Sequence, residues 1–244
     1  MEMSDPLLEV KSVTKRFGGF TALDSVDLAV RPGERLGLIG PNGSGKTTLI
    51  NCVSGTLRNE SGSIRFAGEE IRALPAYQRS RRGIARSFQI PRPFTSMSVL
   101  ENLVVPIEYV AHRALLHAVD TRPEAMAILE KIGLAEKAGT PSNRLSQVEL
   151  RKLELARAMA AKPKLLTSDE AMAGLAGNEV DEVLDILFRL NEAGITIIMI
   201  EHIMQAVMRF SQRVICLDAG KIICEGAPDS IVANPDVQRA YLGV

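Results

Sequence analysis

The chain has 244 residues, and 46% of them are hydrophobic, so it is long enough to bury a sizeable core in one large domain or two small ones. Lysine plus arginine and aspartate plus glutamate both number 29, a balance that excludes the broad basic surface expected of a nucleic-acid-binding protein. No apolar run approaches the roughly eighteen residues that span a bilayer, and the first residues lack a secretory leader, so we expect a protein that is neither secreted nor integral to a membrane.

Two kinds of strand are predicted along the chain. The alternating run at 26–30 and the pair of runs within 214–226 are typical of antiparallel strands, the second of them a hairpin. Short unbroken apolar runs at 35–40, 164–169 and 195–202 instead predict parallel strands that are buried on both faces. We therefore expect a mixed α/β architecture.

Helical patterns separate these strands. They occupy 46–55, 123–134, 146–161 and 179–193, with glycine, proline or asparagine where each helix is expected to stop. The pattern from about 90 to 155 is entirely helical and interrupts the alternation of helices with strands. We interpret it as a helical subdomain inserted into an α/β core.

A candidate phosphate-binding loop follows the first buried strand. Its sequence, GPNGSGKTT, matches G-x-x-x-x-G-K-[ST] and opens a predicted helix, which is the context that this motif requires. Its glycines allow backbone N–H groups to surround phosphates, Lys46 reaches the β- and γ-phosphates, and the Thr47 hydroxyl is suited to Mg²⁺. A glycine-rich turn that only caps a helix is the alternative, and the strand, lysine and threonine together argue against it. The predicted ATP-binding residues of the loop are Gly40, Pro41, Asn42, Gly43, Ser44, Gly45, Lys46, Thr47 and Thr48.

Two adjacent carboxylates end the strand predicted at 164–169. Asp169 is placed to complete a Mg²⁺ site, and Glu170 is placed to orient or deprotonate an attacking water. An acidic turn without a function is the alternative, which the phosphate-binding loop elsewhere in the chain disfavours. Thr167 and Ser168 are polar residues in a strand expected to be buried, so their hydroxyls need backbone hydrogen-bond partners.

Three motifs together carry a family resemblance: the phosphate-binding loop, the acidic strand and the stretch PSNRLSQVELRKLELARAMA at 141–160. In these motifs and their order, the chain resembles the ATP-binding subunit of an ABC transporter over essentially its whole length. The resemblance implies one ATP-binding domain: a P-loop NTPase core with a mixed sheet, an antiparallel β subdomain and an inserted helical subdomain. The core is expected to comprise about 1–89 and 162–244, and the helical subdomain about 90–161.

The same resemblance assigns roles to further residues. Phe17 occupies the place of an aromatic that stacks on adenine, with an exposed loop aromatic as an equal alternative. Gln89 matches the glutamine of the Q-loop, which contacts the γ-phosphate and the metal, and His202 matches the switch histidine, which contacts the γ-phosphate. Residues 171–177 resemble the D-loop that communicates between subunits, with Ala171 in place of the usual proline.

The signature motif departs from the family pattern. Where the family has LSGGQ, this chain has LSQVE at 145–149, and in the family this helix start contacts ATP bound to the partner subunit. Ser146 is retained and is a predicted ATP contact. Gln147 and Val148 add Cβ atoms where glycine allows close approach, and a β-branched residue held in a glycine conformation costs about 1–3 kcal/mol. Glu149 adds a carboxylate near a polyanion, so we expect a weakened contact.

Within the family, residues 83–103 and 224–243 look most like the branched-chain amino acid type of importer. That type implies an ATP-hydrolysing subunit at the cytoplasmic face of the cell membrane that powers the import of branched-chain amino acids or related small polar solutes. It also implies three kinds of partner: a second ATP-binding subunit in a homodimer or heterodimer, integral permease subunits and, indirectly, an external solute-binding protein. No nucleic acid is expected as a partner.

Three other functions are weighed against this one. A mechanical ATPase acting on DNA or ribosomes is disfavoured because the chain has neither two fused units nor a long coiled coil. A small-molecule kinase would leave the signature helix and His202 unexplained. A nucleotide-binding regulatory subunit with weak hydrolysis is the serious alternative, because the signature motif is altered.

Two further segments are candidate surface contacts. The stretch from Pro91 to Phe94 follows the Q-loop, where the family receives the coupling helix of the permease. A run of arginines is interpreted as a solvated helix face, with a phosphate or lipid patch as the alternative: Arg79, Arg81, Arg82 and Arg86.

Overall fold

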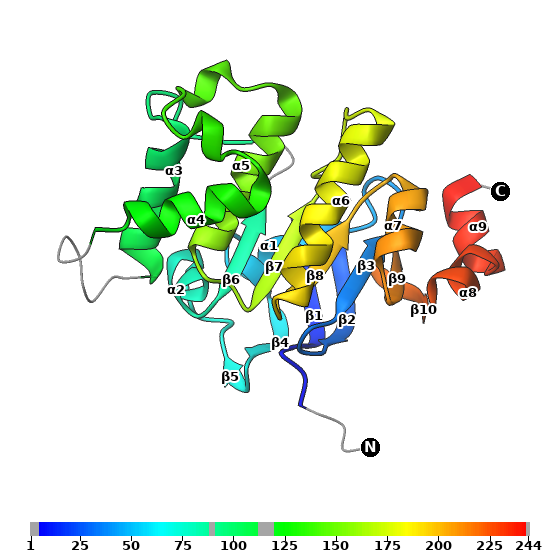
Figure 1. The fold of residues 1–244 in the computed structure, drawn as a ribbon. Helices are drawn as coiled ribbons and strands as arrows, with labels where there is room; N and C mark the ends of the chain where they lie inside the picture. Colours follow the sequence, from blue (N-terminus) through cyan, green and yellow to red (C-terminus); the bar gives the residue numbers. More distant parts are fainter. Residues whose placement is uncertain (1–4, 88–90, 112–119, 243–244) are drawn as a thin grey trace.

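A six-stranded, mainly parallel sheet forms the centre of the molecule in the computed structural model, which describes residues 5–87, 91–111 and 120–242 (Figure 1). The strands lie in the order β10-β9-β3-β8-β7-β6, and only β10 runs antiparallel to its neighbour. The predicted parallel strands and the hairpin are therefore confirmed. The bounds are β3 Arg35–Ile39, β6 Ile84–Ser87, β7 Leu165–Asp169, β8 Thr196–Ile200, β9 Arg213–Asp218 and β10 Lys221–Gly226.

A second, antiparallel sheet of four strands lies behind the first. Its order is β2-β1-β4-β5, and the sequence pattern at 26–30 identified only the last part of β2. Between the two sheets lie the apolar side chains of α1, in one core cluster with residues of both sheets. The bounds are β1 Leu8–Phe17, β2 Phe20–Val30, β4 Ser61–Phe66 and β5 Glu69–Glu70.

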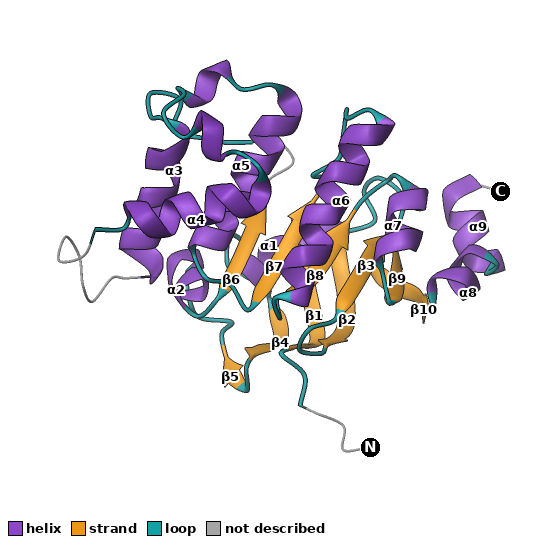
Figure 2. Ribbon diagram, in the orientation of Figure 1, coloured by secondary structure: helices purple, strands orange, loops and turns teal. Residues whose placement is uncertain are grey.

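The helices cover the large sheet on both faces and at one end (Figure 2). Figure 2 shows α6 and α7 in front of the sheet and α3, α4 and α5 gathered beside β6. This arrangement agrees with the predicted fold class, whereas the subdomain boundaries at 90 and 161 stay a prediction. The bounds are α1 Lys46–Ser54, α2 Ala76–Arg81, α3 Val99–Pro106, the π-helical turn η1 Ile107–Ala111, α4 Arg122–Ile132, the 3₁₀ turns η3 Ala135–Lys137 and η4 Ser142–Arg144, α5 Gln147–Ala160, α6 Gly177–Glu192, α7 Met204–Phe210, α8 Pro228–Val232 and α9 Pro235–Leu242.

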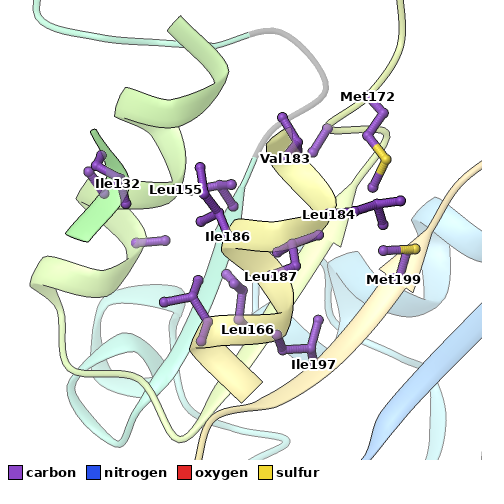
Figure 3. Packing of buried hydrophobic residues seen from close by; sticks show 14 of the residues in the cluster. Ile132, Leu155, Leu166, Met172, Val183, Leu184, Ile186, Leu187, Ile197 and Met199 are labelled. Carbon is purple, nitrogen blue, oxygen red and sulfur yellow. The ribbon is translucent and has the colours of Figure 1, made fainter. Parts of the chain in front are cut away.

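The parallel strands β7 and β8 are apolar on both faces because each face has its own cover. Leu166 and Ile197 pack against Ile186 and Leu187 of α6 on one face (Figure 3). Their chain neighbours point the other way, as successive strand residues must, and join the core between the two sheets. The unbroken apolar runs in the sequence follow from this double burial.

The two hydroxyl residues of β7, Thr167 and Ser168, differ in their hydrogen bonding. The Thr167 hydroxyl donates to the carbonyl oxygen of Ala85 at 3.3 Å, as the need for a backbone partner predicts. The Ser168 hydroxyl is fully buried and, among the described residues, has no hydrogen-bond partner, so the same prediction is wrong for Ser168.

Arg79 closes the C-terminal end of α1, the helix that begins in the phosphate-binding loop. The residue is 1% exposed, and its Nη1 donates to the carbonyl oxygens of Cys52 at 2.6 Å and Val53 at 2.8 Å. Its Nε and Nη2 donate to the carbonyl oxygens of Leu74 and Arg72. The planar guanidinium thus satisfies helix-end carbonyls that α1 cannot satisfy itself, and burial lowers the pKa of the group.

The arginine run does not form one surface. Arg81 and Arg82 are exposed, in contact with the Tyr77 ring and with Glu69 respectively, so the prediction of a solvated face holds for them. It is wrong for Arg79, which is buried, and for Arg86, which points into the molecule from β6. The pattern misled because α2 ends at Arg81, after which the chain turns into the sheet.

We expect Arg79→Met to lower the free energy of unfolding by about 2–4 kcal/mol, because two buried and two partly buried carbonyl oxygens lose their donor while the apolar stem is kept. Urea unfolding followed by circular dichroism measures this change. Arg81→Met, an exposed change on the same helix, should shift the free energy by less than about 0.5 kcal/mol. Equal midpoints for the two variants would contradict the capping role.

Candidate nucleotide site

A single pocket collects loops from both sheets. The loop after β3 and the first turn of α1 form its floor, the β1–β2 hairpin borders one side, and the residues that follow β7 and β8 border the other. Nearly all the predicted loop residues take part. The lining comprises Phe17, Phe20, Ala22, Asn42, Gly43, Ser44, Gly45, Lys46, Thr47, Thr48, Glu170 and His202.

The loop depends on glycine at two places. Gly40 has φ +146°, and a Cβ atom there would lie 2.0 Å from the carbonyl oxygen of Leu217. Gly45, at the start of α1, has φ +108°, and a Cβ atom there would lie 2.6 Å from the carbonyl oxygen of Ala22. Both conformations and both clearances exclude other residues, so the loop can bend tightly enough to present its N–H groups at a helix N-terminus.

Lys46 is held back against its own loop. The side chain is buried, and its ammonium donates to the carbonyl oxygens of Gly40 at 2.7 Å and Pro41 at 3.0 Å. Burial lowers the pKa of Lys46, and the nearby carboxylate of Glu170 acts in the opposite direction. An ammonium that already has two neutral acceptors can exchange them for phosphate oxygens, which bind it more strongly.

Glu170 and His202 meet at the edge of the pocket. Nε2 of His202 lies 3.0 Å from Oε1 of Glu170, because the parallel neighbours β7 and β8 end side by side. Glu170 has φ +48°, a strained conformation for a residue with a side chain, and its N–H donates to the carbonyl oxygen of Ile200. The strained turn directs the carboxylate into the pocket.

Asp169 is engaged with an arginine that the sequence did not identify as part of the site. Its Oδ2 lies 2.5 Å from Nη2 of Arg86, and Nη1 of Arg86 contacts Oδ1 of Asn51 on α1. The network connects the end of β7 to the helix that carries Lys46 and Thr47. A hydroxyl from Thr47 and a carboxylate from Asp169 are oxygen donors of the kind that Mg²⁺ prefers.

Two aromatic side chains border the pocket from the β1–β2 hairpin. Phe17 is 48% exposed, and Nζ of Lys15 lies 5.1 Å from the centre of its ring. Phe17 is therefore exposed, as the alternative reading expects, and it lies beside the loop, whereas its stacking on adenine stays a prediction. Phe20 is 61% exposed, pairs with Phe17 across the turn and was not predicted. The near-symmetrical FGGF sequence was the available signal.

The altered signature forms a regular helix start. Ser146 caps α5 by accepting the N–H of Glu149, and Glu149 accepts the N–H of Ser146 in return. Lys137 pairs with Glu149 and, as the largest cause, lowers the pKa of its carboxyl. Gln147 and Val148 lie inside the helix without a positive φ, so the prediction of a glycine-type conformation at these residues is wrong. Ser146 does not line the pocket of its own chain.

Two other predicted features have different outcomes. Gln89 lies outside the described residues. Met172, in the predicted D-loop, donates its N–H at 2.9 Å to Oε1 of Glu201, the residue before the predicted switch histidine. Glu201 is 2% exposed, and burial raises the pKa of its carboxyl to about 7. An acidic residue at the end of an apolar strand was the signal that sequence reasoning did not use.

The fold and the pocket define a class of protein. The P-loop follows the buried parallel strand β3, and the pocket also contains a carboxylate that follows β7 and a histidine that follows β8. This arrangement is typical of a nucleotide-binding P-loop ATPase.

Comparison with known proteins identifies the family. The ABC transporter family matches residues 23–173, and the family described as branched-chain amino acid ATP-binding cassette transporter matches residues 221–244. The chain is 38% identical to BraF of Pseudomonas aeruginosa and to LivG of Escherichia coli, both high-affinity branched-chain amino acid transport ATP-binding proteins, over 99% of each chain. The chain therefore belongs to the ABC transporter family, as an ATP-binding subunit of the kind that hydrolyses ATP to power transport.

Solved structures agree with this assignment. A nucleotide-free ATP-binding cassette from an ABC transporter superposes with a TM-score of 0.88 at 30% identity, covering 98% of this chain and 100% of that one. A cassette in its ADP conformation gives the same TM-score and identity, covering 99% and 100%. The predicted fold class, family and ATPase activity are confirmed.

The buried carboxyl of Glu201 predicts a pH-dependent stability. Its pKa rises from the ordinary value of 4.5 to about 7 on folding, so the folded chain holds this proton more tightly than the unfolded chain. The resulting stability is fully present below about pH 4.5 and is lost as the pH rises through 7. Glu201→Gln keeps an acceptor for Met172 and removes the charge.

Between pH 4.5 and pH 8, the free energy of unfolding of wild type should fall because Glu201 becomes charged. We expect the fall in Glu201→Gln to be smaller by on the order of 3 kcal/mol. Urea unfolding at the two pH values measures the difference. The exposed change Glu192→Gln is the matched control and should follow wild type. Parallel pH profiles for all three proteins would contradict the burial effect.

Proposed function

We propose that this protein is the ATP-hydrolysing subunit of an importer for branched-chain amino acids or related small polar solutes. The support for this cargo is the match of residues 221–244 and the names of the full-length relatives BraF and LivG. The observation that carries the catalytic part is the contact between Glu170 and His202 at the mouth of the P-loop pocket.

Each of these pocket residues has its own role in the proposed reaction. Lys46 and the loop N–H groups neutralise and hold the phosphates of ATP. Glu170 orients the attacking water and receives its proton, while His202 holds that carboxylate through the 3.0 Å contact and lies where the family's switch histidine contacts the γ-phosphate. Phe17 supplies a ring for the adenine base.

Mg²⁺ is the proposed cofactor of ATP. When bound, it neutralises charge on the β- and γ-phosphate oxygens. Thr47 and Asp169 would hold the ion, with Gln89 as a further ligand, and the oxygen donors at the start of α1 and the end of β7 fit this ion. Arg86 contacts both Oδ2 of Asp169 and Oδ1 of Asn51, and so directs that carboxylate toward α1.

The proposed partners follow the family assignment. A second ATP-binding subunit, identical or different, would face the α5 start at Ser146, and integral permease subunits would bind near Pro91–Phe94. Asn102, on α3, orders part of that stretch, since its side chain accepts the N–H of Phe94 at 2.8 Å. The described part of the chain contains no helix long and apolar enough to cross a membrane. From the transport proteins to which the chain is similar, we propose peripheral attachment at the cytoplasmic face of the membrane.

A regulatory subunit with weak hydrolysis receives no support from the names of the relatives reported above. The altered signature motivated that alternative, yet this chain retains Lys46, Asp169, Glu170 and His202 in one arrangement. Those residues act on the ATP bound to this chain, whereas the signature would contact the ATP bound to the second subunit. We therefore favour the hydrolysing subunit.

Lys46→Ala should weaken the binding of Mg·ATP at least about a hundredfold, because two charge-assisted contacts to phosphate are lost. Isothermal titration calorimetry measures the affinity, and circular dichroism verifies the fold. Lys131→Ala, an exposed change on α4, should bind as wild type does. An unchanged affinity in folded Lys46→Ala would refute the P-loop assignment.

Glu170→Gln should retain ATP binding and reduce turnover roughly a hundredfold or more, because the amide keeps the shape of the side chain and cannot accept the proton. Steady-state phosphate release by the purified complex with its partners measures turnover, with Glu192→Gln as the control. If wild type released phosphate no faster than Glu170→Gln, the regulatory alternative would be correct.

A further inference from the structure

The last helix of the chain reaches the phosphate-binding loop. The N–H of Gly40 donates to the phenol oxygen of Tyr241 at 2.8 Å, across 201 positions of sequence. Tyr241 lies in the last turn of α9, far in sequence from the phosphate-binding loop at 40–48. A side chain at the C-terminal end of the chain thus contacts the first peptide of the loop that binds phosphate.

Gly40 has no side chain, so its position is fixed only by contacts to its own backbone groups. The parallel pairing of β3 with β9 ends at Ile39, so the N–H of Gly40 has the Tyr241 hydroxyl as its acceptor instead of a strand. No residue with a Cβ atom fits at Gly40, because that atom would lie 2.0 Å from the carbonyl oxygen of Leu217. Hydrogen bonds to the N–H and the carbonyl oxygen of Gly40 are therefore the available means of fixing its position.

The helix that carries Tyr241 is itself firmly placed. Val237, one turn earlier and on the same face of α9, is 5% exposed and belongs to the main hydrophobic core. Asn234 caps the helix by accepting the N–H of Asp236 at 2.8 Å, and its amide contacts the sulfur of Cys224 on β10. The phenol is held by a docked helix, so its oxygen has a defined position relative to the loop.

Residue 40 is held from two sides in the structure. Tyr241 accepts from its N–H, and the ammonium of Lys46 donates to its carbonyl oxygen at 2.7 Å. When Lys46 turns to the phosphates of a nucleotide, the carbonyl loses its donor, and the contact with Tyr241 persists. The hydroxyl of Tyr241 then keeps the start of the loop in its binding shape at the moment when the internal contact is released.

We propose that Tyr241 is a positioning residue of the nucleotide site, through which the C-terminal helix α9 sets the affinity of the loop for phosphate. The residue acts through the backbone of Gly40 and touches no nucleotide. This inference rests on the assignment of the P-loop as the nucleotide site, which Lys46→Ala tests separately.

Tyr241→Phe tests the proposal because it removes one hydroxyl and retains the ring. We expect the Kd for Mg·ADP, measured by calorimetry on the full chain, to rise three- to tenfold, the range expected for one backbone hydrogen bond. In the complex with its partners, the KM for ATP should rise by a similar factor while kcat stays within about twofold. Tyr77→Phe removes an exposed hydroxyl on α2 and is the matched control, with no change in Kd.

The outcomes separate a positioning role from a structural one. A hydroxyl that only stabilises the fold would lower the melting temperature and leave the Kd unchanged, and that result overturns the proposal. Val237→Ala, which loosens α9, should weaken ADP binding in the wild-type background and have little further effect with Tyr241→Phe. If Val237→Ala weakens ADP binding by the same factor with and without Tyr241→Phe, the proposal is also overturned. If Lys46→Ala failed to weaken binding, the P-loop assignment itself would fail.

Discussion

The parallel pairing of β3, β8 and β7 is the constraint on which the rest of the site depends. Parallel strands end at the same edge of a sheet, so the loop after β3, Glu170 after β7 and His202 after β8 meet although they are far apart in sequence. The strands can pair in this way because both faces are covered, by α6 on one side and by α1 with the antiparallel sheet on the other. The geometry of the pocket therefore depends on the burial of Leu166, Ile197 and their neighbours.

The helix α1 carries Lys46 and Thr47, and three side chains hold it in place, two from distant segments and one of its own. Arg79 closes its C-terminal end, Arg86 connects Asn51 on the helix to Asp169, and Lys46 returns from its first turn to the loop. Each contact satisfies a backbone or charged group that would otherwise be buried without a partner. Polar contacts at both ends of this helix thus give the loop one defined position.

The features predicted from the sequence are those encoded in short segments. The P-loop, the buried strands and the two carboxylates at 169 and 170 are local patterns whose physical reason lies within a few residues. Arg79 and Glu201 could not be assigned because their roles consist of contacts with distant carbonyl and N–H groups, Arg79 reaching 27 positions back to Cys52. A charge run looks the same in sequence whether its members are solvated or cap a buried helix.

The signature helix shows why a motif can depart from its family pattern without local damage. Glycine conformations are not needed here, since α5 begins at Gln147 with ordinary helical geometry, and the exchange of hydrogen bonds between Ser146 and Glu149 satisfies N–H groups at the helix start. The consequence is competition. A phosphate that approached the N–H of Ser146 would have to displace the carboxylate of Glu149, which also pairs with Lys137. For the proposed contact with the ATP of a second subunit, the obstacle at this helix start is therefore the Glu149 carboxylate of the capping box, and not backbone strain at Gln147 or Val148.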